Sequence, residues 1–256
     1  MTSDTNQKNL FSLKGRVALV TGASSGLGRA AATFLVRAGA QVVGLARRAD
    51  ALEQWRGEAG GETAALVADL AADSDIAAIA AKAAAPFGAP DILVNAAGLN
   101  LRQSASDVTP ESWDRTIALN MTVPFFLAQA LVPAMRAKGW GRIVNIASLQ
   151  SRRAFPNGIA YGASKGGVEQ LTRAMAEAWS ADGINANALA PGFFPTELTG
   201  PVFADPELAS AHARATCIGR NGELGDIEGP LLLLASDASA YVTGQLLFVD
   251  GGYTAK

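Results

Sequence analysis

Seven short apolar segments alternate with stretches of helical character along the chain, and this alternation constrains the fold more than any other feature of the sequence. Strands that alternate with helices form βαβ units, in which a parallel sheet is covered by helices on both faces. The apolar segments are continuous, as expected for strands that are buried on both faces. The expected strands are residues 16–20, 41–45, 63–67, 91–94, 142–146, 184–189 and 246–249.

The segments between these strands favour helices, because they are rich in alanine, the residue with the highest helix propensity. One of them begins with Thr109-Pro110, an N-cap followed by proline in the first turn. The sequence therefore predicts an α/β fold: a single Rossmann-type, doubly wound, seven-stranded parallel sheet with helices on both faces. The expected helices are residues 29–37, 49–58, 74–84, a long helix that follows Pro110, and 161–180.

The chain of 256 residues is long enough for one α/β domain with a full core. Residues 1–12 precede the first apolar segment and are expected to form a mobile N-terminal tail, so the single domain is expected to span residues 13–256. The longest irregular stretch is expected at residues 191–205, which are rich in proline and glycine. Loops of that length in compact domains are often functional, so we expect a lid at about residues 193–215.

The composition argues against several classes of function. Lys and Arg number 21 and Asp and Glu 23, so the net charge is −2 and there is no basic excess for a nucleic-acid partner. The single cysteine, Cys217, forms no internal disulfide, which fits the reducing cytoplasm. The N-terminus lacks the apolar segment of a signal peptide, and the apolar run 231–235 is too short to span a bilayer, so no membrane association is expected. His212 is the only histidine, and no metal site is expected.

A glycine-rich turn follows the first expected strand and opens the next helix. Glycines permit a tight turn and a close approach of the backbone to a pyrophosphate, which the positive end of the helix dipole also attracts. Such a turn can be purely structural, but the strand before it and the helix after it favour a dinucleotide site. The turn reads Thr21-Gly22-Ala23-Ser24-Ser25-Gly26-Leu27-Gly28.

The end of the second strand distinguishes the two nicotinamide dinucleotides. A carboxylate there would bind the ribose 2′-hydroxyl of NAD(H), but this strand ends in Leu45 and Ala46. Arg47 and Arg48 follow, and guanidinium groups suit a 2′-phosphate. NADP(H) is therefore favoured over NAD(H), with a solvated turn near Asp50 as the alternative interpretation.

Tyr161 and Lys165 lie four residues apart and share one face of an expected helix. An isolated tyrosine has a pKa of about 10, and a neighbouring ammonium, helped by the charge of a cofactor, would lower this pKa enough for acid–base catalysis at neutral pH. Ser148 follows the strand at 142–146, so its hydroxyl can reach a substrate oxygen at the same edge of the sheet. A lone serine after a strand is usually a turn residue, but the combination of the three is rarely a coincidence.

Asn120 lies four residues before Pro124 in the long expected helix. Proline has no N–H, so the carbonyl of Asn120 is expected to be free and the helix to bend locally. A water bound there would relay protons to Lys165. The alternative is an ordinary proline kink, since Pro133 shows that prolines recur in this segment.

Together these motifs resemble those of the short-chain dehydrogenase/reductase family over nearly the whole chain, from about Leu13 to Gly252. The positions that match the family's catalytic residues are Asn120, Ser148, Tyr161 and Lys165. The expected cofactor contacts are Gly22, Ser24, Ser25, Gly26, Leu27 and Gly28 in the turn, then Arg47, Arg48, Asp69, Leu70, Asn95, Ala96, Gly98, Tyr161, Lys165, Pro191, Gly192, Phe194 and Thr196.

The resemblance implies hydride transfer between a nicotinamide and a ketone/secondary alcohol pair. In this interpretation Tyr161 protonates the carbonyl oxygen and Ser148 orients it, Lys165 binds the ribose hydroxyls and lowers the pKa of Tyr161, and Asn120 holds the relay water. The cofactor carries the hydride, and the protein supplies geometry and electrostatics. The resemblance also implies a homotetramer that acts on a small-molecule carbonyl or alcohol.

Several functions remain open within this resemblance. The sequence is similar to members called gluconate 5-dehydrogenases, which act on a keto-sugar acid, and to members labelled 3-oxoacyl-carrier-protein reductases. Asp182 argues against an acidic carrier protein, although Arg136, Lys138 and Arg173 would be available to bind one. An apolar wall around Phe193 would also suit a bulky neutral ketone. A non-catalytic dinucleotide sensor on the same fold is a remote alternative.

The substrate pocket is expected around Ser148 and the lid. An arginine near Ser148 would hold a substrate carboxylate in a bidentate contact, and Arg152 and Arg153 are the candidates, with a solvated loop as the alternative. The further expected pocket residues are Gln150, Phe155 and Phe193.

Overall fold

The computed structural model describes residues 9–72 and 75–256. Most of the expected N-terminal tail, residues 1–8, lies outside the described residues, as does Ser74, where one helix was expected to begin. Leu13 is fully buried, and its N–H donates to the carbonyl of Ala38, so the packed part of the chain begins at this residue.

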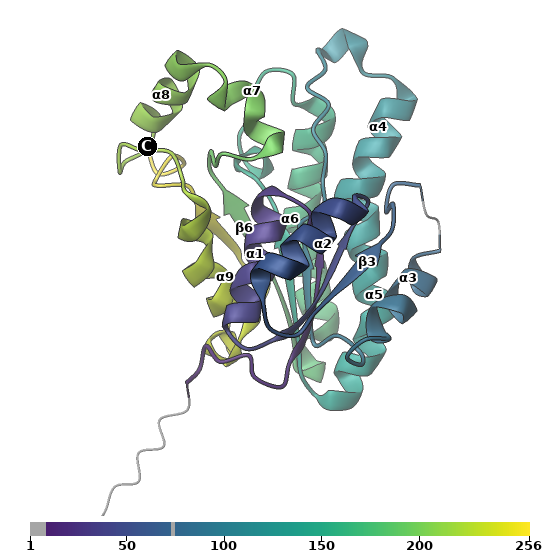
Figure 1. Ribbon diagram of the computed structural model, residues 1–256. Coiled ribbons are helices and arrows are strands. Elements are labelled where there is room, and N and C mark those ends of the chain that lie inside the picture. The colour runs from purple at the N-terminus through teal and green to yellow at the C-terminus, as the bar shows by residue number, and fades with distance from the viewer. Residues whose placement is uncertain (1–8, 73–74) are drawn as a thin grey trace, which may run out of the picture.

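One seven-stranded sheet forms the centre of the molecule, and every strand pair in it is parallel (Figure 1). The strand order is β3-β2-β1-β4-β5-β6-β7, which confirms the predicted doubly wound fold. The order reverses between β1 and β4, and ligands of such sheets bind at the carboxyl ends of the strands at this point. The strands are β1 Val17–Thr21, β2 Gln41–Ala46, β3 Thr63–Val67, β4 Ile92–Asn95, β5 Gly141–Ile146, β6 Ile184–Pro191 and β7 Leu246–Val249.

Helices cover both faces of the sheet, with a separate apolar core on each. Because successive side chains of a strand point to opposite faces, Val20 of β1 packs with helices α1, α2 and α9, whereas Leu19 packs with α3, α5 and α6. The helices are α1 Gly26–Arg37, α2 Ala49–Ala59, α3 Ile76–Ala84, α4 Pro110–Ile117, α5 Val123–Lys138, α6 Ile159–Trp179, α7 Gly200–Phe203, α8 Pro206–Ala215 and α9 Glu228–Ala235.

The long helix expected after Pro110 is divided by a π-helical turn, Ala118–Thr122, into α4 and α5. The turn ends just before Pro124, where the sequence predicts a bend, and the N–H of Val123 donates to the carbonyl of Ala118. By length and composition alone, the stretch Pro110–Lys138 is apolar enough to cross a membrane. In the fold, its α5 part packs as a core helix against α3 and the sheet.

The segment 191–205 is less irregular than predicted, because a 3₁₀ turn, Glu197–Thr199, leads directly into α7 and then α8. Pro201 favours an irregular stretch in the sequence, but it lies in the first turn of α7, as Pro206 does in α8, and proline is tolerated there. The side chain of Asp205 caps α8 by accepting hydrogen bonds from the N–H groups of Glu207 and Leu208. The sequence also gave no sign of α9, whose apolar run was considered only as a membrane segment.

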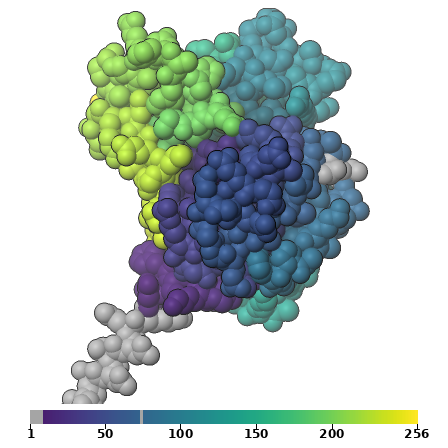
Figure 2. Space-filling view, viewed as in Figure 1, coloured from purple at the N-terminus to yellow at the C-terminus, as the bar shows by residue number. Residues whose placement is uncertain are grey.

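Two parts of the chain project beyond the carboxyl edge of the sheet. Figure 2 shows them as a green part, which contains α7 and α8, and a teal part around α4, with a hollow between them. Both parts follow the carboxyl ends of strands, since the lid segment (residues 193–215) continues from β6 and α4 lies beyond the loop after β4. The fold therefore places the hollow where a ligand of this sheet is expected.

Candidate active site

The glycine-rich turn between β1 and α1 has no room for side chains at its glycines. A Cβ atom at Gly28 would lie 2.3 Å from the carbonyl oxygen of Gly22, and one at Gly22 would lie 2.9 Å from the backbone nitrogen of Ala97. Gly22 also has φ +72, a conformation that favours glycine. The side-chain oxygen of Thr21 accepts hydrogen bonds from the N–H groups of Ala96 and Ala97, both at 3.0 Å, and so fixes the backbone after β4 against the turn.

These contacts fit a dinucleotide. The turn brings bare backbone to the carboxyl edge of the sheet, and α1 begins there at Gly26. Within α1, a fully described helix, the N-cap Ser25 makes no side-chain capping bond and the first turn carries no acidic residue. The N–H groups of that turn and the positive end of the helix dipole therefore suit a pyrophosphate.

The four predicted catalytic residues come together from three separate elements. The Ser148 hydroxyl, after β5, hydrogen-bonds the phenol of Tyr161 in α6. The Lys165 nitrogen lies 5.7 Å from the centre of the Tyr161 ring. A Cβ atom added at Gly98 would lie 3.2 Å from Oδ1 of Asn120 and 3.8 Å from Nζ of Lys165, so both side chains border this glycine.

Burial shifts the two titratable groups of this cluster in opposite senses. Lys165 is only 4% exposed, its ammonium donates to the carbonyl of Ile146 at 2.5 Å, and burial lowers its pKa to about 8. Burial raises the pKa of Tyr161, against the lowering effects of its hydrogen bond with Ser148 and of the positive charge of Arg102. In the protein alone, the pKa of Tyr161 is thus shifted upwards, opposite to the direction that the sequence predicts for the enzyme with its cofactor.

The side chain of Asn120 is held by three hydrogen bonds. Its Oδ1 accepts from the N–H of Leu99 at 2.9 Å, and its Nδ2 donates to the Leu99 carbonyl and to the hydroxyl of Ser164, both at 3.0 Å. The Ser164 hydroxyl donates in turn to the carbonyl of Tyr161 at 2.7 Å. The sequence predicts a role for the backbone carbonyl of Asn120, but its amide also connects the loop after β4 to the catalytic helix.

A buried polar chain that the sequence did not reveal continues behind the site. Nδ2 of Asn95 donates to Oδ1 of Asn145 at 2.8 Å, and Nδ2 of Asn145 donates to the hydroxyl of Thr172 at 2.9 Å. These bonds connect β4, β5 and α6. An asparagine within the apolar strand 142–146 was the available signal, because a polar residue in a doubly buried strand needs a partner.

Both arginines that the sequence assigns to the 2′-phosphate face carboxylates. Arg47 lies 3.7 Å from Asp69, and Arg48 forms two short hydrogen bonds with Glu197 of the lid segment. Glu197 was not predicted. A groove of about 520 Å³ runs along this contact, lined by Ser24, Ser25, Gly26, Arg29, Arg48, Ala51, Gln54, Pro195, Thr196, Glu197, Phe203 and Leu224.

The other expected cofactor residues differ in what they present to the site. Phe194 is only 3% exposed, and its ring packs against Gly222. Leu70 is buried in the core near β4. The methyl group of Thr196 lies against Gly26, where an added Cβ would be 3.2 Å away. Pro191 ends β6, and Gly192 lies too close to Asp250 for a side chain.

The expected substrate residues divide into two groups. Phe155 and Phe193 meet edge to face, with ring centres 6.0 Å apart, and His212 stacks on Phe193 at 3.6 Å. Tyr253 completes this aromatic cluster. Oε1 of Gln150 is buried beside Gly158, without a hydrogen-bond partner among the described residues.

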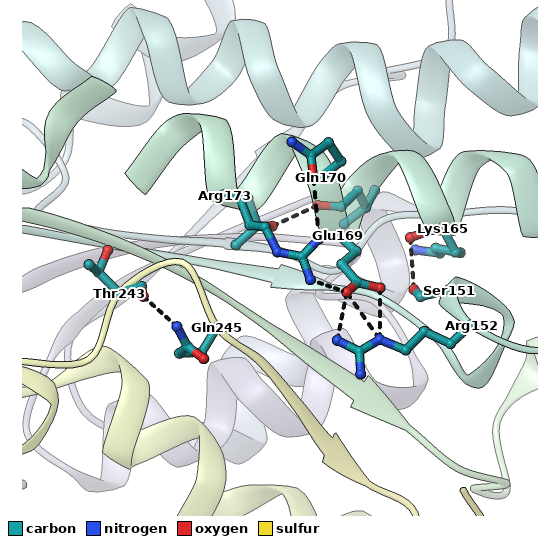
Figure 3. A network of polar contacts seen from close by, with 10 residues as sticks. Ser151, Arg152, Lys165, Glu169, Gln170, Arg173, Thr243 and Gln245 are labelled. Carbon is teal, nitrogen blue, oxygen red and sulfur yellow. Dashed lines mark hydrogen bonds and ion pairs between the residues drawn. The ribbon is translucent and has the colours of Figure 1, made fainter. Parts of the chain in front are cut away.

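Arg152 does not approach the pocket, because Glu169 of α6 holds its guanidinium (Figure 3). Glu169 also pairs with Arg173, and both arginines donate to Oε1 of its carboxylate in the close-up. Arg153 donates from Nη1 to the carbonyl of Tyr253 at 3.1 Å and lies over the ring of that residue. The expected contact between an arginine and a substrate carboxylate therefore stays a prediction for both residues, and for Arg152 it would require release from Glu169.

The positive charge of Arg102 lowers the pKa of Tyr161, against the effect of burial, and the sequence did not identify this residue. It follows Asn100 in the loop after β4, has φ +52, and donates from Nη2 to the carbonyl of Leu198 in the lid segment at 3.0 Å. Oδ1 of Asn100 accepts from its N–H at 3.1 Å and supports this backbone conformation. A cation just beyond the fourth strand was the available signal, because that loop starts at the carboxyl edge of the sheet.

Comparison with known proteins agrees with this geometry. The family model described as enoyl-(acyl carrier protein) reductase matches residues 22–254. A gluconate 5-dehydrogenase of Gluconobacter oxydans is 40% identical over 96% of this chain and 97% of its own length, and a 2-dehydro-3-deoxy-D-gluconate 5-dehydrogenase of Escherichia coli is 40% identical over 96% and 98%. The structure of a gluconate 5-dehydrogenase from Burkholderia cenocepacia, in complex with NADP and tartrate, has a TM-score of 0.90 and 38% identity over 96% of this chain and 98% of that one.

The chain belongs to the short-chain dehydrogenase/reductase family. It is therefore an oxidoreductase that acts on CH–OH groups, and the predicted family resemblance is confirmed. In this chain, the four candidate catalytic residues lie around one edge of the sheet: Asn120, Ser148, Tyr161 and Lys165. The structure also adds two residues to consider: Arg102, which donates to the carbonyl of Leu198, and the neighbouring Glu197, which pairs with Arg48.

Replacement of Tyr161 by Phe removes the hydroxyl that we expect to act as the proton donor. We expect kcat to fall by about 10²- to 10⁴-fold, the usual contribution of general acid–base catalysis, while the Kd for the dinucleotide changes little. Initial-rate kinetics and fluorescence titration measure the two quantities. Activity within about tenfold of wild type would contradict the role of Tyr161.

Replacement of Lys165 by Met is expected to stabilise the protein measured without added nucleotide. Because burial lowers the pKa of Lys165 from 10.5 to about 8, the unfolded chain binds more protons between these pH values, and wild-type stability rises with pH there. The variant should exceed wild type by up to about 3 kcal/mol at pH 7, and the gain should shrink between pH 8 and 10.5. Urea unfolding at several pH values measures this.

The exposed Lys82 of α3 offers a matched control, since its replacement by Met removes a lysine without changing a buried charge. Its effect on stability should not depend on pH over the same interval. If Lys165→Met destabilised the protein equally at every pH, the ammonium would not carry a burial cost.

Proposed function

We propose that the protein is an NADP(H)-dependent dehydrogenase that interconverts a keto-sugar acid and the corresponding sugar acid, in the manner of a gluconate 5-dehydrogenase. The position of Arg102 carries this proposal. Its positive charge acts on Tyr161, so it lies within electrostatic reach of the oxygen that Tyr161 would protonate. A guanidinium there can bind the carboxylate or hydroxyl groups of an acidic sugar, which a neutral ketone does not require.

Each residue of the site has a distinct role in this proposal. Ser148, already hydrogen-bonded to Tyr161, orients the substrate oxygen, and Tyr161 donates the proton during reduction. Lys165 supplies a buried positive charge beside the phenol. Asn120 holds the loop after β4 against α6. When bound, the nicotinamide supplies or accepts the hydride.

Two observations support NADP(H) as the cofactor. The second strand ends in Ala46, so no carboxylate is available there for the 2′-hydroxyl of NAD(H), and Arg47 and Arg48 follow directly. The related structure from Burkholderia cenocepacia contains NADP. The guanidinium groups of Arg47 and Arg48 can bind the negatively charged 2′-phosphate through charge-assisted hydrogen bonds.

A carrier-protein substrate is less well supported, because the cations that would bind it are engaged within the chain. Arg136 pairs with Asp182 at 2.7 Å, and Lys138 pairs with the buried Asp91 at 2.7 Å. Arg173 is held by Glu169. An acidic carrier would have to displace internal carboxylates at each of these positions.

A neutral ketone is the second candidate, and the aromatic cluster favours it. Phe155, Phe193, His212 and Tyr253 form a continuous apolar surface close to the lid segment. Such a surface gains free energy by burying apolar substrate groups, whereas a polyol would leave hydroxyl groups unpaired against it.

A substrate panel combined with one substitution separates the two candidates. With NADPH, we expect 5-ketogluconate to be reduced faster than acetoacetyl thioesters or cyclic ketones, and Arg102→Met to lower kcat/KM for the keto acid by about 10- to 100-fold, the loss expected for a hydrogen bond to a charged group. Neutral ketones should be affected much less. Initial rates for both proteins measure this.

Arg153→Met serves as the matched control, since it removes a second cation near the aromatic cluster. A loss confined to the Arg153 variant would assign the carboxylate to Arg153 instead. Turnover of neutral ketones alone, unaffected by Arg102→Met, would favour the second candidate.

We further propose that the enzyme is a cytoplasmic homotetramer. Large apolar side chains are exposed on α5, before β7 and on β7 itself: Phe126, Tyr241 and Leu247. Contiguous exposed apolar patches commonly mark subunit contacts, and we infer that these side chains contribute to such patches.

Light scattering coupled to size-exclusion chromatography should therefore give a mass of four 26.3 kDa chains. Replacement of Tyr241 by Glu, which puts a charge into the expected contact, should shift the mass to a smaller species. A 26.3 kDa species at micromolar concentration would contradict the proposal.

A further inference from the structure

The contact between Arg48 and Glu197 joins the start of α2 to the lid segment across the glycine-rich turn. Nη1 of Arg48 donates to Oε1 of Glu197 at 2.8 Å, and Nη2 donates to Oε2 at 3.0 Å. Oε2 also accepts from the hydroxyl of Ser25 at 3.0 Å. The carboxylate is therefore held by a guanidinium in the bidentate arrangement and by one hydroxyl, which is the most favourable geometry for such a pair.

The same donors are those expected to hold a 2′-phosphate. Nη2 of Arg48 also contacts the hydroxyls of Ser24 and Ser25, at 3.2 and 2.9 Å. These residues lie at the end of β2 and in the glycine-rich turn, where the adenosine end of a dinucleotide binds in folds of this type. A phosphate needs the positive charge of a guanidinium and several hydrogen-bond donors. The Glu197 carboxylate already binds the guanidinium of Arg48 and the hydroxyl of Ser25.

If a phosphate and the Glu197 carboxylate both bound Arg48, their two negative charges would lie close together and repel each other. Sharing Arg48 therefore costs free energy. NADP(H) must displace or weaken the Arg48–Glu197 pair, whereas NAD(H) has no group that competes for it. The pair is half-exposed, with the Arg48 side chain 49% and the Glu197 side chain 63% accessible, so this cost is modest. This cost lowers the affinity for NADP(H) relative to the affinity for NAD(H).

We propose that Glu197 is a cofactor-specificity residue, which weakens binding of the 2′-phosphate of NADP(H) relative to NAD(H) by holding Arg48 in an ion pair. This inference rests on the proposed NADP(H) site but not on the identity of the substrate. Arg47, which lies 3.7 Å from Asp69 in a looser pair, remains available to the phosphate.

Competition between a 2′-phosphate and Glu197 for Arg48 also affects how the lid segment is attached. Glu197 is followed by Leu198, whose carbonyl accepts from Arg102 near the catalytic tyrosine, and is preceded by Thr196, which lies against Gly26. One short turn of the lid segment therefore contacts both the nucleotide edge and the substrate edge of the hollow. Release of Glu197 by a 2′-phosphate removes the attachment at the nucleotide edge.

The test is a comparison of binding by wild type and Glu197→Gln, which keeps the size of the side chain and removes its charge. Two ligand pairs differ only in the 2′-phosphate: NADP⁺ and NAD⁺, and adenosine 2′,5′-bisphosphate and 5′-AMP. Calorimetric titration should show that the variant binds the phosphorylated member of each pair about two- to fivefold more tightly, as loss of an exposed ion pair predicts. The Kd of the other member should not change.

Two further variants make the result specific. In an Arg48→Met background, the Glu197 substitution should no longer alter the ratio of affinities, because its partner is gone. Glu207→Gln, which removes a charge elsewhere in the lid segment at the start of α8, should leave the ratio at its wild-type value.

Other outcomes overturn the proposal. Equal changes for both members of each pair would mean that the ion pair only holds the lid segment. No change in Glu197→Gln, together with loss of the preference in Arg47→Met, would assign the phosphate to Arg47 alone. If wild type binds no NADP⁺, the proposed cofactor is wrong, but a gain of NADP⁺ binding in Glu197→Gln would still support the inference, and its absence would refute it.

Discussion

The close approach of two backbone segments at the point where the strand order reverses determines the rest of the site. Gly22 lies so near Ala97 that no side chain fits between the end of β1 and the end of β4. Thr21 holds the second segment in place through two hydrogen bonds. Because both faces of the sheet are already covered by helices, this edge is where backbone donors remain accessible, and the catalytic residues gather around it.

The catalytic cluster is a costly arrangement that the surrounding fold maintains. An ammonium at Lys165 loses hydration on burial and receives one carbonyl, that of Ile146, as a hydrogen-bond acceptor. A buried phenol beside it resists ionisation for the same reason. The two shifts move the pKa values apart, because burial lowers the pKa of Lys165 to about 8 and raises the pKa of Tyr161 above its ordinary value, so the phenol is protonated at neutral pH. The buried polar chain behind them, through Asn145, keeps the supporting helix in register with the sheet.

The sequence predicted the sheet well because doubly buried strands are continuous apolar runs, and all seven were found within two residues of their observed bounds. The proximity of Tyr161 and Lys165 could be predicted because their spacing is local, and the catalytic roles stay predictions. The sequence did not predict α8 or the roles of Arg102 and Glu197. Prolines at helix starts resemble those in loops, and contacts between Arg48 and a residue 149 positions away depend on how the lid segment folds back over the sheet.

The π-helical turn between α4 and α5 contains one residue more than a turn of a regular α-helix. In an α-helix each residue advances the side-chain direction by about 100°. The turn therefore interrupts the regular hydrogen-bond pattern between α4 and α5, and Asn120 lies within it. Deletion of one residue from the turn would change the direction of the Asn120 side chain relative to α5 by about 100°, and the hydrogen bond from its amide to the hydroxyl of Ser164 in α6 would be lost.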